Sequence, residues 1–237
     1  MRLDKYTAHL ADSRKEIRKI ISDGLITVNG KTVKNAGLAV TDSDIIEYRG
    51  ERVLYREFIY IMMNKPAGVI SATFDPRQKT VVDLLPKEMK RFEPFPVGRL
   101  DIDTEGLLLL TNDGQMAHRL LSPKRKVPKK YIAHTDGVMT EDETQSFESG
   151  VLLDDGYKTL PAKLKPIGVD GEESVYEVTI SEGKFHQIKR MFAEFGKKVV
   201  YLKRVEFASL TLDKSLKNGE FRELSDEEFD KLFKIMQ

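Results

Sequence analysis

The residues best suited to chemistry lie in the segment 98–114, which reads GRLDIDTEGLLLLTNDG. Two carboxylates, Asp101 and Asp103, stand two residues apart and shortly precede a run of four leucines. On a strand, carboxylates at this spacing would lie on one face of a sheet, about 7 Å apart. Such a pair could bind a metal ion, serve as the two acids of a glycoside hydrolase, or form a polar turn.

The composition of the chain weighs on these alternatives. It contains no cysteine, no tryptophan and only four histidines. Disulfides, thiol nucleophiles and thiolate zinc sites are therefore excluded. The scarcity of histidine disfavours a metal cluster, and the lack of tryptophan disfavours a sugar-binding enzyme that would stack its substrate on such rings.

Charge is segregated along the chain although the net charge is only +1. Basic residues gather in 1–35, 119–134 and 184–206, whereas 136–156 holds seven acidic residues and no basic one. Three basic clusters are typical of a protein that binds an anionic polymer. Because no signal-peptide pattern and no apolar run of about 20 residues occurs, we expect a cytoplasmic protein.

Residues 1–57 are predicted to form a small first domain. The apolar residues of its first 20 positions recur at helical spacing, and Asp12 or Ser13 is placed to cap a second helix. The segment 25–33 then predicts a tight hairpin, since its centre is Asn29-Gly30. A basic helix beside a hairpin is the expected product.

Residues 58–237 are predicted to form a second domain of α+β class, with a mixed, mainly antiparallel sheet flanked by helices. The leucine run 107–110 is expected to be a central strand beneath the polar segment. Other strands are predicted at 58–63, 69–72, 130–135, 158–166, 174–180, 199–205 and 210–212. Helices are predicted at 141–149, 185–195 and 225–236.

Three further segments accompany the leucine-rich one in a definite order. They read NKPAGVIS at 64–71, KKY at 129–131 and SEGKFHQIKRMF at 181–192. Together these segments resemble the pseudouridine synthase family, in the branch that acts on uridines of ribosomal RNA. The first domain is similar to the S4 RNA-binding domain, and the resemblance spans essentially the whole chain. One departure is Ala208, where the family usually has glycine.

The resemblance implies an isomerase that needs neither cofactor nor metal. The bond between uracil N1 and ribose C1′ is broken, the base rotates, and C5 is joined to C1′. Asp101 would be the nucleophile, and Tyr131 would stack on the base or assist proton transfer. Lys189 would keep the carboxylate charged through a single contact with Asp101.

Neighbouring residues are assigned supporting roles by the same resemblance. Asp103 and Thr104 would hold the loop that carries the nucleophile, and Glu105 would face solvent. Arg99 would either contact the nucleophile directly or form an ion pair within the scaffold. RNA would be bound by basic residues of both domains, namely Arg14, Lys15, Arg18, Lys19, Lys129, Lys130 and Arg190.

The expected partner is 16S ribosomal RNA, either as free RNA or within an assembling small subunit, and the expected target is a uridine of the 516 type. The enzyme is expected to be a monomer. The chain has no basic C-terminal tail, which favours this target over 23S ribosomal RNA. A 23S enzyme of the same family is one alternative. A non-catalytic S4-type binding or ribosome-assembly factor is another, which the joint presence of Asp101, Tyr131 and Lys189 disfavours.

Overall fold

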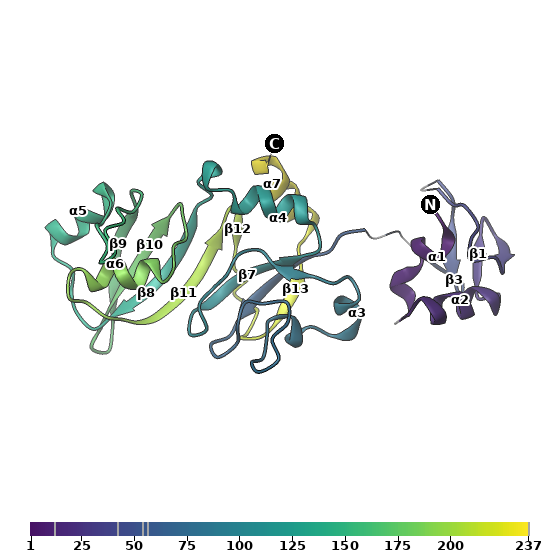
Figure 1. Ribbon diagram of the computed structural model, residues 1–237, viewed down its shortest axis with the longest axis horizontal. Helices are drawn as coiled ribbons and strands as arrows, with labels where there is room; N and C mark the ends of the chain where they lie inside the picture. Colours follow the sequence, from purple (N-terminus) through teal and green to yellow (C-terminus); the bar gives the residue numbers. More distant parts are fainter. Residues whose placement is uncertain (12, 42, 54, 56, 237) are drawn as a thin grey trace. The chain divides into compact units, whose positions relative to one another are not determined.

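A computed structural model describes residues 1–11, 13–41, 43–53, 55 and 57–236. The chain divides into two compact units (Figure 1). The first comprises Met1–Ile59 and Leu85–Pro94, and the second comprises Tyr60–Leu84 and Phe95–Gln237. No sequence pattern indicated that the segment Leu85–Pro94 belongs with the first unit, and the domain boundary at residue 57 stays a prediction.

The first unit packs short helices on a small antiparallel sheet of order β2-β1-β3-β4. Ser13 caps its main helix by accepting a hydrogen bond from the Glu16 amide at 3.1 Å, as the sequence predicted, whereas Asp12 lies outside the described residues. Its helices are α1 (Leu3–Tyr6), η1 (Ala8–Leu10), α2 (Arg14–Ser22) and, from the second segment, α3 (Lys87–Lys90). Its strands are β1 (Ile26–Val28), β2 (Lys31–Val33), β3 (Ile46–Tyr48) and β4 (Glu51–Arg52).

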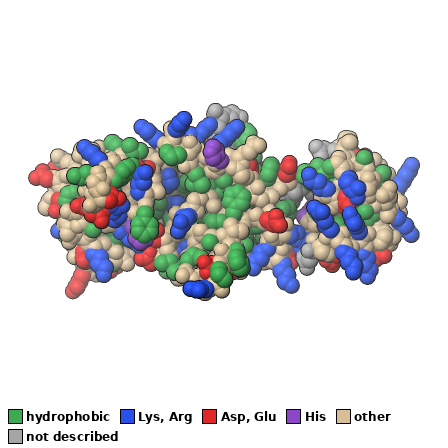
Figure 2. Space-filling model, viewed as in Figure 1, with side chains coloured by type: hydrophobic (Ala, Val, Ile, Leu, Met, Phe, Trp, Pro, Cys, Tyr) green, Lys and Arg blue, Asp and Glu red, His purple; other side chains and the backbone are tan. Residues whose placement is uncertain are grey.

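Helix α2 is amphipathic, and its two faces have different tasks. Ile17 and Ile21 are buried in one core with Ile26 and Val28 of β1. The opposite face carries four exposed basic residues, Arg14, Lys15, Arg18 and Lys19. Figure 2 shows Lys and Arg side chains gathered over this part of the unit. The predicted basic helix beside a hairpin is confirmed.

The second unit is built on one sheet of order β13-β5-β7-β11-β8-β10-β9, to which β6 and β12 are added at the side. Every pairing is antiparallel except that of β7 with β11, so the predicted mixed, mainly antiparallel sheet is confirmed. The strands are β5 (Tyr60–Lys65), β6 (Phe95–Pro96), β7 (Glu105–Thr111), β8 (Lys129–Thr135), β9 (Lys163–Asp170), β10 (Glu173–Ile180), β11 (Val199–Phe207), β12 (Leu210–Thr211) and β13 (Phe221–Glu223). The helices are η2 (Val82–Leu84), α4 (Gly114–Leu121), η3 (Pro123–Arg125), α5 (Glu141–Ser149), α6 (Gln187–Ala193) and α7 (Asp226–Met236).

The leucine run forms most of β7, between β5 and β11, and all four leucines are fully buried. Gly106 precedes them at the point where β7 meets β11. A Cβ atom at Gly106 would stand 2.2 Å from the carbonyl oxygen of Arg204, and the backbone there has a φ of +101°. Only glycine fits both conditions. The central strand predicted beneath the polar segment is confirmed.

Several segments of the second unit differ from the sequence predictions, among them the strand predicted at 158–166, which the structure places at Lys163–Asp170 as β9. The strand predicted at 58–63 continues through Asn64 and Lys65 as β5, since both residues are buried and pair with β7. The strand expected at 69–72 reduces to one isolated bridge between Ile70 and Thr80. None of the helices in the described part of the chain has the length and apolarity that crossing a bilayer requires.

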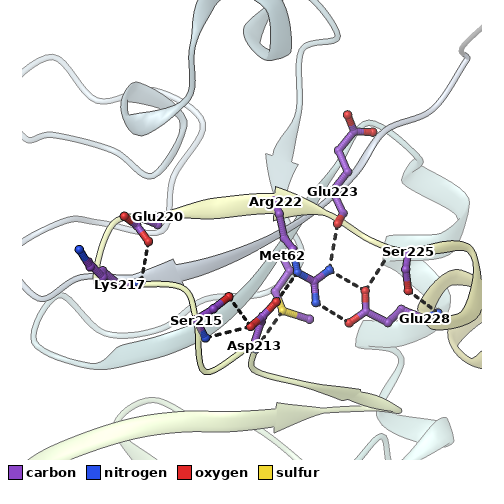
Figure 3. A network of polar contacts seen from close by, with 9 residues as sticks. All are labelled: Met62, Asp213, Ser215, Lys217, Glu220, Arg222, Glu223, Ser225 and Glu228. Atoms are coloured by element: carbon purple, nitrogen blue, oxygen red, sulfur yellow. Dashed lines mark hydrogen bonds and ion pairs between the residues drawn. The ribbon is translucent and has the colours of Figure 1, made fainter.

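The C-terminal segment is fastened to the sheet by the ion-pair network of Figure 3. From β13, Arg222 donates to Asp213 at 2.6 Å and, through both terminal nitrogens, to Glu228 of α7 at 2.7 Å. Bonds from Ser215 and from Arg222 hold the pKa of Asp213 at about 2. Such two-armed pairing is the strongest form of arginine–carboxylate contact.

Arg222→Met is expected to lower the free energy of unfolding at pH 7 by about 2 kcal/mol, because two carboxylates lose their partner. The pKa of Asp213 is depressed in the folded state. Its contribution to the free energy of unfolding is therefore complete above its ordinary pKa of 3.8, and it is lost as the pH falls through about 2. Urea unfolding at neutral and at acidic pH measures this. Equal stabilities at neutral pH would show that the network adds nothing.

Candidate active site

Asp101 lies in a tight turn that leads into β7. The Thr104 amide donates to the Asp101 carbonyl at 3.1 Å and closes this turn. The Ser71 hydroxyl donates to the Leu100 carbonyl and accepts from the Leu100 amide, both at 3.0 Å. Asp101 and Asp103 therefore lie in a turn. The strand that their spacing also allowed is not formed at these residues.

Lys65 anchors the same turn from below. Its side chain is fully buried, and Nζ donates to the carbonyls of Thr104 at 2.9 Å, Pro66 at 3.0 Å and Asp101 at 3.1 Å. Burial lowers the pKa of Lys65 to about 8, opposed by the nearby carboxylates. Sequence reasoning assigned Lys65 no role, because nothing local shows which carbonyls a lysine at a strand end will meet.

A lysine and a histidine flank the Asp101 carboxylate, whose side chain is 28% exposed. Lys189 Nζ lies 3.7 Å from Oδ2, and His186 Nε2 lies 3.7 Å from Oδ1. Both come from the start of α6, where His186 adopts a left-handed conformation with a φ of 49°. His186 stood in the quoted segment 181–192 but was assigned no role.

Lys189 makes the single contact expected with Asp101, and it is shared with a second carboxylate, that of Asp103. Its Nζ forms a 2.5 Å hydrogen bond with Asp103 Oδ1, and this bond holds the pKa of Asp103 below its usual range. The Asp103 side chain is 66% exposed, and it contacts α6 through Lys189. Asp103 therefore sets the position of Lys189, while Thr104 shapes the turn through its backbone.

An open cleft of about 440 Å³ lies over these groups and is called here the Asp101 cleft. Tyr131 of β8 lines it although only 7% of this residue is exposed, so the ring belongs to the core and the cleft together. Arg99 is exposed and lines the cleft as well. Within the described part of the chain Arg99 forms no ion pair, which leaves it available at the cleft.

The predicted RNA-binding residues of this unit are not all at the cleft. Lys129 and Tyr131 share one face of β8, whereas Lys130 lies on the other and pairs with Glu206 at 3.0 Å. Arg190 is held by ion pairs to the two acidic residues Asp154 and Asp155. For Lys130 and Arg190, a contact with RNA stays a prediction.

Glu105 and Ala208 were also singled out in the sequence, and the structure describes the surroundings of both. Glu105, expected to face solvent, is half-buried and accepts hydrogen bonds from Tyr201 and Asn218 at 3.0 Å each. Ala208 has a φ of 55°, a left-handed conformation that explains the glycine usual at this position. No three His, Asp or Glu side chains among the described residues are grouped as metal ligands would be.

Comparison with known proteins assigns both units. The family model "RNA pseudouridylate synthase" matches residues 59–194, and the S4 domain model matches residues 1–46. A crystal structure of a pseudouridylate synthase shares 35% of residues with a TM-score of 0.66, covering 98% of this chain and 99% of the other.

Relatives of full length carry related names. An uncharacterized RNA pseudouridine synthase of Bacillus subtilis (strain 168), YtzG, is 51% identical over 96% of both chains. Ribosomal large subunit pseudouridine synthase B of the same organism is 41% identical, over 98% of this chain and 95% of its own length. Ribosomal small subunit pseudouridine synthase A of Vibrio vulnificus (strain CMCP6) is 39% identical, over 99% of this chain and all of its own. The chain thus belongs to the RNA pseudouridylate synthase family and is an isomerase with an N-terminal S4 domain.

Proposed function

We propose that the protein converts one uridine of 16S ribosomal RNA, of the uridine 516 type, to pseudouridine in the cytoplasm. The observation that carries the chemistry is the Asp101 carboxylate, open to its cleft and flanked by Lys189 and His186, each at 3.7 Å. A fixed, charged carboxylate can attack an electron-poor sugar carbon, as the nucleophile of a retaining glycosidase does.

The proposed steps balance without any added reactant. Asp101 forms a bond to C1′ while the N1–C1′ bond breaks and leaves its electron pair on the uracil. The base then rotates, C5 attacks C1′, and the Asp101 carboxylate departs. Loss of the proton from C5 and gain of one at N1 complete the isomer. Tyr131, which lines the cleft, would hold the detached base against its ring.

The target uridine has to leave its stack to reach this cleft, because a paired uridine cannot present C1′ to the Asp101 carboxylate. Phosphates on either side would be held by lysine and arginine side chains, with affinity added by the exposed basic face of α2. That face would choose the RNA that is engaged and would not alter the chemistry.

A 23S ribosomal RNA target is the second candidate. It is favoured by the 41% identity to the large-subunit enzyme of Bacillus subtilis, whereas the 39% identity to the small-subunit enzyme of Vibrio vulnificus favours 16S. Since the two values are so close, only an assay of the reaction on both RNAs decides between the targets.

The test incubates the protein with naked 16S rRNA, naked 23S rRNA and partly assembled small subunits. Carbodiimide modification followed by primer extension then locates pseudouridine. One new stop in 16S rRNA, near the position equivalent to 516, supports the proposal. A stop in 23S rRNA alone replaces the target, and the absence of stops on all three substrates contradicts the proposal.

Lys189 offers a graded test of the charge beside Asp101. Lys189→Met is expected to lower kcat about 100-fold, because the negative charge that develops on the uracil as the N1–C1′ bond breaks loses a nearby cation. Lys189→Arg keeps that charge and is expected to stay within about 10-fold of the native enzyme. Single-turnover rates measure both variants. Equal losses would show that the amine itself, and not its charge, is required.

A further inference from the structure

A second and larger pocket, called here the flanking pocket, adjoins the Asp101 cleft. Its empty volume is about 1200 Å³, and Arg99, Tyr131 and Lys184 line both spaces. Asp101 and Lys189 line the Asp101 cleft but not the flanking pocket. Lys129 and Arg204 line the flanking pocket but not the cleft. A nucleotide in the cleft would therefore have its neighbour beside this pocket.

Two of the cations that line the flanking pocket, Lys129 and Arg204, lie against one aromatic ring. Lys129 Nζ lies 5.9 Å and Arg204 Cζ lies 4.9 Å from the centre of the Phe207 ring. Arg204, which is 2% exposed, donates from Nε to the Leu107 carbonyl at 2.7 Å, yet its buried Nη2 has no partner among the described residues. Lys129 Nζ donates to the Val127 carbonyl at 2.9 Å.

The acidic residue among those that line this pocket, Glu182, already has hydrogen-bond partners. Glu182 accepts hydrogen bonds from Tyr157 at 2.6 Å, from the Leu160 amide at 2.8 Å and from Gln187 at 2.9 Å. Burial and the charge of Arg204 lower the pKa of Lys129 to about 8. The pocket therefore has donors in excess, and a ligand that brings acceptors would satisfy them.

The walls decide which kind of acceptor fits. They include four apolar side chains, Val97, Leu120, Leu121 and Val127. A phosphate dianion would have to give up its hydration shell to lie against these side chains, which disfavours its binding. A planar base can instead bury its faces and present only its edge to Lys129. Guanine has two acceptors side by side, O6 and N7, which lysine and arginine match. Adenine places a donor beside N7 and would oppose the cations.

We propose that the flanking pocket receives a guanine base from a nucleotide next to the target uridine, with Lys129 donating to its O6 and N7 edge. This inference rests on the proposed function, because the target nucleotide in the Asp101 cleft brings its neighbour to the pocket. It adds a determinant of sequence specificity that lies outside the reaction centre.

The first test needs no turnover. Binding of guanosine, adenosine, uridine and inorganic phosphate to the full chain is measured by ligand-observed nuclear magnetic resonance. Inosine and 7-deazaguanosine are measured in the same way. Guanosine and inosine are expected to bind at least about 10-fold more tightly than adenosine or 7-deazaguanosine. Lys129→Met is expected to remove this preference and Lys129→Arg to retain it. Lys165→Met, at an exposed lysine of β9, serves as the matched control.

Each outcome decides for or against the proposal. Equal binding of guanosine and adenosine, or a preference that survives in a folded Lys129→Met variant, contradicts it. Binding of phosphate that competes with guanosine and depends on Lys129 would identify an anion site instead. Thermal unfolding of every variant shows whether a loss of binding reflects a loss of structure.

The second test uses the RNA that the native protein modifies. Guanosines on either side of the target are replaced in turn by 7-deazaguanosine or 2-aminopurine riboside. At one position, kcat/KM is expected to fall about 10- to 100-fold, and Lys129→Met is expected to be insensitive to the same replacement. If pseudouridine forms and no replacement matters, this inference is wrong while the proposed function holds. If guanosine binds as expected and no RNA is modified, the proposed function is wrong.

Discussion

Asp101→Asn is expected to abolish pseudouridine formation, with a loss in kcat of at least about 10,000-fold. An amide has the shape of the carboxylate but is neutral and a poor nucleophile toward C1′. The turn keeps its other supports in the variant, since Thr104, Ser71 and Lys65 bind backbone atoms of the turn and not the Asp101 carboxylate. The loss should therefore fall on the chemical step.

Release of tritium from RNA labelled at C5 of uridine measures that step directly. Asp103→Asn is the matched control, because it makes the same change on a carboxylate that shares Lys189. We expect this control to stay within about 10-fold of the native rate, with RNA affinity and thermal stability unchanged in both variants. A larger loss in Asp103→Asn than in Asp101→Asn would move the nucleophile to Asp103.

Lys65→Met is the second change with a large expected effect. It leaves the carbonyls of Pro66, Asp101 and Thr104 without their buried donor. We expect the free energy of unfolding to fall by about 3 kcal/mol, and kcat to fall about 100-fold because Asp101 is no longer held in place. Lys79→Met, at an exposed lysine of the same unit, should alter neither quantity.

The pH dependence identifies Lys65 as the source of the effect. Its pKa is about 8 in the folded protein against an ordinary 10.5, so the unfolded chain binds more protons between these values. The native protein should therefore gain up to roughly 3 kcal/mol over Lys65→Met as pH rises from 8 to 10.5. A constant difference across that range would show that Lys65 is not buried in its charged form.

Activity should respond in the opposite direction to stability over the same range. A neutral amine has two N–H bonds, fewer than the three carbonyls that the charged Lys65 holds within 3.1 Å. We therefore expect kcat of the native enzyme to decline above about pH 8 as the turn loosens, and this decline to be absent in Lys65→Met. Single-turnover rates at a series of pH values separate the two effects.

Much of the fold could be predicted from the sequence because it follows local rules. A capping serine fixed the start of α2, Asn29-Gly30 fixed the first hairpin, and the strands predicted at 130–135 and 174–180 are β8 and β10. The same rules failed at 69–72, where an apolar stretch pairs through one bridge only. Periodicity reports which side chains are buried and is silent on whether a partner strand is present.

The candidate site depended on more than local pattern. Ordered segments resembling those of a known family pointed to Asp101, Tyr131 and Lys189, and the structure brings all three to one cleft. The division of Lys189 between Asp101 and Asp103 and the proximity of His186 did not follow from that resemblance. Ion-pair geometry depends on where a turn and a helix start meet, and on which oxygen is nearer.

By itself, the sequence determined the family, the class of reaction, the two-domain order and the central leucine strand. Only the tertiary structure placed Lys65 under a turn that lies 36 to 39 residues away, and Lys129 beside Arg204. The reason is that a buried cation is positioned by carbonyls and rings from distant strands. Spacing along one segment contains no information on those partners until the sheet brings them together.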